Sequence, residues 1–256
     1  MIFSDMNRLP TLSLALVLTA LACAPKRLAA PAPVPVPALA AKSAVTDSLP
    51  NDVKWVRASA EYRALTRQAF AYASERLPEL THGLPSGGWA VILDADETVL
   101  DNSEYQRRLA VAHAAFDAKT WATWVNERAA PAIAGAPEFT MHVHALGGRI
   151  IIVTNRSMAE CDPTRANLTS AAIDADAVLC QPPGEHDKNP RFERVQGGTA
   201  VPGMPALTVV EWVGDNIFDF PKLTQKVRTD SVALGDFGKR LFIVPNPMYG
   251  SWEHMH

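Results

Sequence analysis

The stretch VILDADETVLD, residues 91–101, decides the fold of this chain. It is led by Trp89 and Ala90, and its apolar start predicts a strand that is buried on both faces. The strand ends in Asp94 and Asp96, two acids that repel each other unless a cation or a proton shares the site. Open parallel sheets bind ligands at the carboxyl ends of their strands. We therefore expect a ligand site at the end of this strand.

Strand and helix patterns alternate along the rest of the chain. The expected strands cover residues 89–95, 149–153, 177–179, 207–213 and 241–244. The expected helices cover residues 52–77, the segment with Trp121 and Trp124, residues 137–146, residues 163–172, and a segment that starts near Ile217. This alternation predicts an α/β fold with a doubly wound parallel sheet. Trp121 and Trp124 are expected to be core or cap aromatics, because they are spaced three residues apart on a helix.

The composition gives no reason to expect a nucleic-acid partner. The 256 residues carry a net charge of -3, and no basic tract stands out. A protein that binds a nucleic-acid polymer would need a basic surface, so we expect none as a partner.

The first 50 residues read as a targeting region. Residues 1–22 are predicted to be a signal peptide, with Arg8 before a short apolar segment, residues 12–21. Its end fits either ordinary signal cleavage or a lipobox, in which Cys23 would carry a lipid anchor to a membrane. Residues 23–50 are rich in Ala and Pro, which favours an extended tether. We expect an exported protein, either an outer-membrane lipoprotein or a periplasmic or secreted one.

The folded domain is expected to cover residues 51–256. It contains two further cysteines, Cys161 and Cys180. An exported chain meets an oxidising compartment, where such a pair is able to form a disulfide. The alternative is two buried thiols.

Polar residues follow three of the expected strands. Thr154 and Asn155 follow the second strand and Asp215 follows the fourth, so they lie at the same sheet edge as Asp94 and Asp96. Lys188 lies in a polar loop after the third strand. Carboxylates, a hydroxyl and an ammonium suit phosphoryl transfer, in which positioning and charge neutralisation supply most of the catalysis. Mg²⁺ prefers oxygen ligands of this kind, so we expect it as the cofactor.

These motifs resemble those of the class C bacterial acid phosphatases in the haloacid-dehalogenase superfamily. The matching segments are residues 94–100 with Asn102 and Tyr105 after them, residues 153–156, Lys188, residues 214–220, and residues 245–253. Lys239 is a distant competitor for the role of Lys188. The resemblance implies a haloacid-dehalogenase-like Rossmannoid fold with a small helical cap, formed by residues of about 51–80 and 102–137.

The resemblance also implies roles for the acids. Asp94 would be the nucleophile and a metal ligand, and Asp96 the general acid and base whose backbone carbonyl touches the metal. Asp215 would bind the metal directly, and Asp219 would support it through water. Crowding by other carboxylates supports Asp96 as the acid. Glu97 is expected to be a helix-start or solvent-exposed acid.

The remaining roles concern the substrate. Thr154 would bind the phosphate and Lys188 would neutralise it, while Asn155 is either a turn residue or a phosphate-side donor. Tyr249 would either stack on a nucleobase or pack the C-terminal segment. Asp101, like Glu97, is expected at a helix start or in solvent rather than as a ligand.

The expected activity is hydrolysis of small phosphomonoesters, such as nucleoside 5'-monophosphates, through an aspartyl-phosphate. The alternatives are a phosphotransferase that uses the same intermediate and a non-catalytic surface lipoprotein that acts as a binding module. The family also implies a homodimer.

Overall fold

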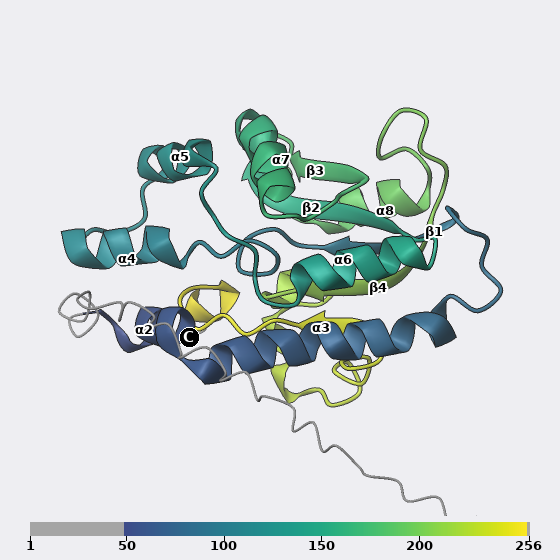
Figure 1. The fold of residues 1–256 in the computed structure, drawn as a ribbon, viewed down its shortest axis with the longest axis horizontal. Coiled ribbons are helices and arrows are strands. Elements are labelled where there is room, and N and C mark those ends of the chain that lie inside the picture. Colours follow the sequence, from purple (N-terminus) through teal and green to yellow (C-terminus); the bar gives the residue numbers. More distant parts are fainter. Residues whose placement is uncertain (1–48, 255–256) are drawn as a thin grey trace, which may run out of the picture. The chain divides into compact units, whose positions relative to one another are not determined.

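The computed structural model describes residues 49–254 (Figure 1). The expected signal peptide, Cys23 and nearly all of the tether lie outside the described residues. Within the part of the chain that is described, no helix is both long enough and apolar enough to cross a membrane.

Five parallel strands form one sheet in the order β3-β2-β1-β4-β5. The central strand β1 (Trp89–Leu93) lies between β2 (Arg149–Ser157) and β4 (Thr208–Gly214). The two edges are β3 (Ala177–Gln181) and β5 (Leu241–Ile243). All five residues of β1 are buried, as the apolar sequence requires. The chain leaves β1 toward β2 and later returns to β4 on its other side, so the strand order reverses at β1, where ligands bind in such sheets.

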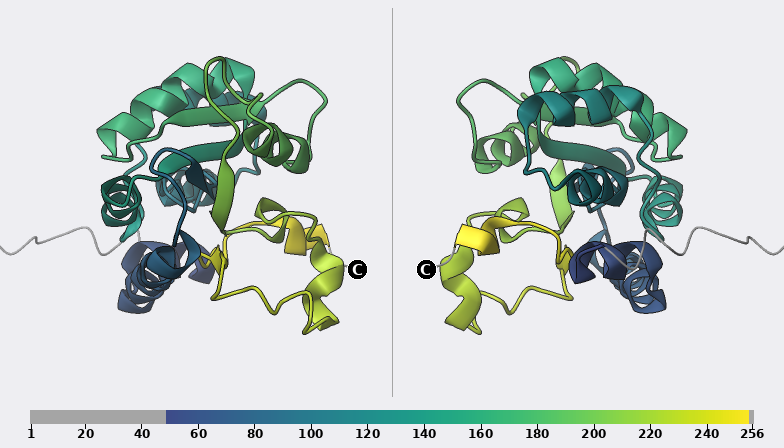
Figure 2. Two further views of the ribbon diagram at one scale, coloured as in Figure 1. Left: turned by 90° about the vertical axis from the view of Figure 1, so that its right-hand side faces the viewer. Right: turned by 90° about the vertical axis from the view of Figure 1, so that its left-hand side faces the viewer.

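Helices cover both faces of the sheet (Figures 1 and 2). One face packs against α3 (Ala60–Leu80), α6 (Ala136–Ala145) and α7 (Cys161–Ser170), and its core includes Val91 and Leu93. The other face packs against α8 (Asn189–Gln196) and the segment after β4, with the alternate residues of β1, Ala90 and Ile92, in its core. The alternation of side chains along β1 therefore supplies both cores. The expected doubly wound α/β fold is confirmed.

Three further helices lie at the carboxyl edge of the sheet (Figure 1). They are α2 (Asn51–Ala58), α4 (Ser103–Ala112) and α5 (Ala118–Glu127). Helix α2 contacts α4, and α5 contacts α7. We call α2, α4 and α5 the cap.

The structure corrects the expected single helix over residues 52–77. Ser59 ends α2 in an extended conformation and begins α3, where its side-chain oxygen accepts a hydrogen bond from the Tyr62 backbone N–H at 3.0 Å. Most of the expected cap segment 51–80 is α3, and α3 packs against α6, β4 and β5 rather than over the site. Its apolar residues Phe70, Ala73 and Leu77 are buried in the core of the sheet.

Two further helices differ from expectation. Helix α8 directly follows the polar loop of residues 185–188 and was not expected from the sequence; its Phe192 and Val195 are buried against the sheet. The helix expected near Ile217 is a single 3-10 turn, which a reciprocal capping interaction between Asn216 and Asp219 closes. The described 3-10 turns are η1 (Met158–Glu160), η2 (Ile217–Asp219), η3 (Gln225–Thr229) and η4 (Ser251–His254).

A disulfide joins Cys161 and Cys180. It links the first residue of α7 to the edge strand β3, and the two half-cystines are 19 residues apart in the chain.

Candidate active site

A cavity of about 860 Å³ lies between the carboxyl ends of the strands and the cap. The strand ends contribute Asp94, Asp96, Asn155, Arg156 and Asp215 to its wall. The cap contributes mostly apolar side chains to the wall opposite. The cavity therefore has a polar floor and an apolar roof, which is usual for a site that binds an organic anion.

Asp94 lies at the floor of the cavity. Its backbone N–H donates to the Val213 carbonyl at 3.0 Å, which continues the β1–β4 ladder by one residue. The Lys188 ammonium contacts the Asp94 carboxylate and also lies 2.7 Å from Asp219 Oδ1. Burial raises the pKa of the Asp94 carboxyl to about 7, and the charge of Lys188 opposes that rise. Burial works against the charged form of Lys188, but the two carboxylates raise the pKa of its ammonium overall.

Three carboxylates gather around this point. Asp94, Asp215 and Asp219 each offer an oxygen, and these oxygens lie within 4.8 Å of one another. Burial raises the pKa of Asp215 well above its usual value, and the charges of Asp219 and Asp94 add to the rise. Three acids around one point, two of them buried and Asp215 half-buried, form a set of oxygen donors that fits a divalent cation such as Mg²⁺. Asp219, expected to act through water, lies in the same group of three as Asp94 and Asp215.

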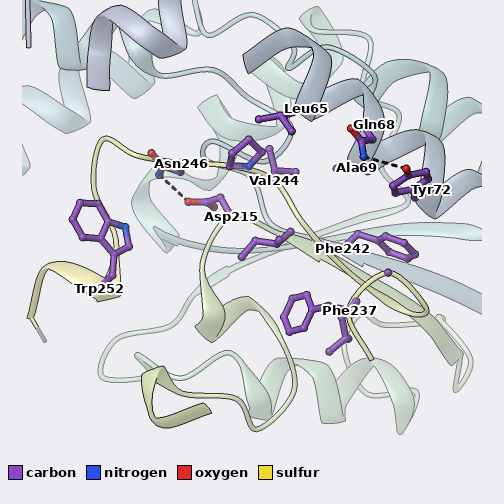
Figure 3. Close-up of a pocket in the computed structure, with 14 residues that line it drawn as sticks. Leu65, Gln68, Ala69, Tyr72, Asp215, Phe237, Phe242, Val244, Asn246 and Trp252 are labelled. Carbon is purple, nitrogen blue, oxygen red and sulfur yellow. Dashed lines mark hydrogen bonds between the residues drawn. The ribbon is translucent and has the colours of Figure 1, made fainter. Parts of the chain in front are cut away.

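Two neutral side chains hold Asp215. Thr98 Oγ1 donates to Asp215 Oδ1 at 3.1 Å, and Asn246 Nδ2 donates to Asp215 Oδ2 at 2.9 Å (Figure 3). Thr98 belongs to the opening motif and Asn246 to the C-terminal segment. Asp215 also lines a second hollow of about 490 Å³, which lies beside β5 and α3 (Figure 3).

Asp96 has different partners from the other acids. Arg156 Nη2 lies 2.7 Å from Asp96 Oδ1 and Asn102 Nδ2 lies 2.8 Å from the same oxygen. From the sequence, only other carboxylates were expected to crowd Asp96, and its contact with the Arg156 guanidinium was not predicted. Arg156 is buried at the end of β2, two residues after Thr154. A basic residue directly after a polar strand end was the available signal.

Thr154 and Asn155 lie beside these groups at the end of β2. Thr154 is buried, and its Oγ1 accepts a hydrogen bond from the Arg156 backbone N–H at 3.1 Å. Asn155 lines the cavity, and its Oδ1 accepts a hydrogen bond from Arg191 Nη2 at 2.6 Å. Arg191, also missed from the sequence, is buried and pairs with Glu185 at 3.0 Å. It anchors the polar end of β2 to helix α8.

Glu97 is not the solvent-exposed acid that the sequence offered as one possibility. Glu97 is buried, and its carboxylate accepts hydrogen bonds from the Asn102 backbone N–H at 2.8 Å and from the Tyr249 hydroxyl. Burial raises the pKa of Glu97 well above its usual value. Asp101 is a helix-start acid as expected, since it accepts a hydrogen bond from the Ser103 backbone N–H at 2.8 Å.

Tyr249 packs as one of its two expectations requires, and its stacking on a nucleobase stays a prediction. It lines the cavity, and it packs against the small cluster of buried residues under α2. Lys188 lies in the cavity, whereas its competitor Lys239 is exposed and does not line it. The structure thus brings Asp94, Asp96, Asn155, Lys188, Asp215, Asp219 and Tyr249 to one cavity.

This fold and donor set define an enzyme of the haloacid-dehalogenase type. The profile of the haloacid-dehalogenase (HAD) superfamily, subfamily IIIB (Acid phosphatase), matches residues 8–252. The chain belongs to this family and is a phosphoric monoester hydrolase. The resemblance seen in the sequence is confirmed.

Two solved structures are similar to this chain over most of its length. Both are of the class C acid phosphatase from Bacillus anthracis, one of them with tungstate bound. Each is 29% identical to this chain, with a TM-score of 0.71, and the match covers 82% of this chain and 88% of the other.

Proposed function

We propose that this chain is an exported, Mg²⁺-dependent acid phosphatase that hydrolyses small phosphomonoesters, nucleoside 5'-monophosphates among them, through an aspartyl-phosphate on Asp94. One observation carries the proposal. The buried Asp94 carboxylate lies at a strand end beside a buried ammonium and two further carboxylates, and the more exposed Asp96 shares the same cavity.

In the first step an Asp94 carboxylate oxygen bonds to phosphorus as the ester P–O bond breaks. The electron pair of that bond stays on the leaving oxygen, which takes a proton from Asp96. Lys188 lies against Asp94, so its charge can offset that of the phosphate as the two anions meet. The proposed donor to a phosphate oxygen is the Thr154 hydroxyl at the neighbouring strand end, although the Thr154 side chain is buried and does not line the cavity.

In the second step Asp96 takes a proton from water while the water oxygen bonds to phosphorus. The bond between phosphorus and Asp94 breaks, which releases inorganic phosphate and restores both acids. Mg²⁺ held by Asp94, Asp215 and Asp219 would offset the negative charge of the nucleophile and the phosphate. Phosphate monoesters are among the slowest esters to hydrolyse unaided, so this charge neutralisation must supply much of the catalysis.

The roof of the cavity supports an organic leaving group of some size. The cavity volume of about 860 Å³ falls within the range of small-molecule sites and exceeds what a bare phosphate needs. Leu109 and Trp121 line it from the cap, Phe116 lines it from the loop between α4 and α5, and Tyr249 lines it from the C-terminal segment. Aromatic and apolar walls suit a flat ring such as a nucleobase.

A phosphate-release screen of the purified chain tests the proposal. It compares nucleoside monophosphates, sugar phosphates and phosphotyrosine with Mg²⁺ at mildly acidic pH, and an added alcohol detects phosphotransfer. We expect phosphate release that a chelator abolishes and Mg²⁺ restores. Activity that is unchanged by chelation would contradict the role of the metal.

The anchor is tested separately. If Cys23 carries lipid, Cys23→Ser should move the protein from the membrane fraction to the soluble fraction of the cells that make it. An unchanged distribution would contradict lipidation at Cys23.

A further inference from the structure

A chain of hydrogen bonds joins the cap to Asp96. Trp124 Nε1, on α5, donates to Asn102 Oδ1 at 2.8 Å, and Asn102 Nδ2 donates to Asp96 Oδ1 at 2.8 Å. The side chains of Trp124 and Asn102 are buried. We propose that Trp124, acting through Asn102, positions the Asp96 carboxylate for its proton transfers, an inference that rests on the proposed function of Asp96.

The indole helps to determine which way the Asn102 amide points. An indole N–H can only donate, so the oxygen of the amide must face Trp124. The NH₂ group must then face Asp96, where it donates to a carboxylate oxygen. If the amide turned over, its oxygen would face that carboxylate and repel it. Arg156 Nη2 also donates to Asn102 Oδ1, at 3.3 Å, so Trp124 at 2.8 Å is the nearer of the two donors that select the orientation in which Asn102 supports Asp96.

The same contacts distinguish the two oxygens of Asp96. Oδ1 accepts from Asn102 Nδ2 at 2.8 Å and from Arg156 Nη2 at 2.7 Å and Nε at 3.0 Å. Oδ2 accepts from Arg156 Nε at 3.2 Å, and within residues 49–254 it has no second donor. With its lone pairs occupied, Oδ1 cannot readily carry a proton. Oδ2 is the oxygen that exchanges the proton with the leaving group and with water.

Hydrogen bonds fix the position of helix α5, which carries Trp124. The Asp117 side chain accepts the backbone N–H groups of Lys119 and Thr120 at 2.9 and 3.1 Å, which fixes the start of the helix. The Tyr105 hydroxyl lies 3.0 Å from Thr120 Oγ1, which ties α5 to α4. The Trp121 ring, also on α5, lies 5.4 Å from the Arg156 guanidinium. Helix α5 therefore contacts Arg156, the other partner of Asp96, as well.

The leaving group provides the test. A nitrophenolate leaves without help, whereas an alkoxide needs a proton from the general acid, a contribution of about 10²- to 10⁴-fold. Trp124→Phe keeps an aromatic ring in the core and removes the N–H donor. We expect it to lower kcat/KM for glycerol 2-phosphate about tenfold and for p-nitrophenyl phosphate less than about twofold. A merely structural role would lower both values alike.

A control variant and a second test variant complete the experiment. Trp55→Phe makes the same change on α2, at a ring that packs edge-on against Tyr62 at 5.4 Å, and should leave both substrates unaffected. Asn102→Asp is isosteric and still accepts from Trp124, but it places an oxygen where the donor to Asp96 stood. It should lower kcat/KM for glycerol 2-phosphate about 100-fold and again more than for p-nitrophenyl phosphate. Circular dichroism and thermal unfolding check that each variant folds.

The outcomes separate the positioning role of Trp124 from the proposed phosphatase function. A selective loss with glycerol 2-phosphate in both variants supports the positioning role, and if Trp124→Phe does not fold, Asn102→Asp decides alone. Equal losses for the two substrates, or none, overturn that role while the phosphatase activity stands. A wild-type protein that releases phosphate from neither substrate overturns the proposed function itself.

Discussion

Arg156 contacts the carboxylate of Asp96 with two nitrogens: Nη2 lies 2.7 Å from Oδ1, and Nε lies 3.0 Å from Oδ1 and 3.2 Å from Oδ2. The guanidinium is buried, whereas 20% of the Asp96 side chain is exposed to the cavity. A planar fork fixes both the position and the rotation of a carboxylate, which a single point charge does not. The pair therefore orients an acid that must face the substrate.

Replacing the Arg156 guanidinium by a lysine ammonium tests whether Arg156 orients Asp96. Arg156→Lys keeps the charge but loses the paired contacts, so we expect kcat/KM for phosphomonoesters to fall about 100-fold. Arg165→Lys is the control, because Arg165 pairs at the surface with the highly exposed Asp162. Equal steady-state activity in the two variants would refute the orienting role of Arg156.

Lys188 lies among carboxylates that need a cation. Lys188→Met leaves Asp94 and Asp219 without the ammonium, and breaking such a buried pair costs about 3–5 kcal/mol. We expect the unfolding free energy at neutral pH to fall by that order in chelator, and Mg²⁺ to restore more stability to the variant than to the wild type. Lys239→Met, at an exposed lysine, should do neither. Denaturant unfolding with and without Mg²⁺ measures both effects, and wild-type stability of Lys188→Met in chelator would count against this account.

Glu211 makes stability depend on pH. It lies fully buried in β4, and within residues 49–254 neither of its carboxylate oxygens has a hydrogen-bond partner. Burial raises the pKa of Glu211 from 4.5 to about 9, and the charge of Arg76 opposes the rise. Between these values the folded protein holds a proton that the unfolded chain releases, so the folded state loses stability as pH rises.

Glu211→Gln removes this loss. Its unfolding free energy relative to the wild type should stay constant below about pH 4.5 and increase toward pH 9, by at least about 1 kcal/mol at pH 8. Glu75→Gln, at an exposed position of α3, should show no such trend. Urea titrations at several pH values give the comparison, and a difference that does not change with pH would show that Glu211 is ionised in the folded protein.

The strand ends were predictable because their chemistry is local. The apolar run before Asp94 and the run before Asp215 each indicate a buried strand, and parallel strands bring such acids together without further information. The five strands were found within a few residues of their observed ends, apart from β2, which runs on to Ser157. The observed helix α3 runs past Pro78 to Leu80, whereas the expected helix ended at residue 77. A proline in the last turn removes few helical hydrogen bonds, so it does not end the helix.

The partners of the acids were not predictable in the same way. Asn102 and Trp124 are 22 residues apart, and Arg156 is 60 residues from Asp96, so their contacts depend on how the cap packs on the sheet. Glu97 looked like a solvent acid because nothing nearby in the sequence shows that the Tyr249 hydroxyl reaches it. Long-range packing of this kind carries no local signal.

The most direct test of the account is to trap the phosphate on the enzyme. Wild-type protein and Asp94→Asn are mixed with a phosphomonoester and Mg²⁺, quenched in acid within one turnover, and digested for mass spectrometry. The account predicts phosphate on the peptide that contains Asp94 in the wild type, and neither phosphopeptide nor turnover in a folded Asp94→Asn. Phosphate on another residue, or turnover by Asp94→Asn, would contradict it.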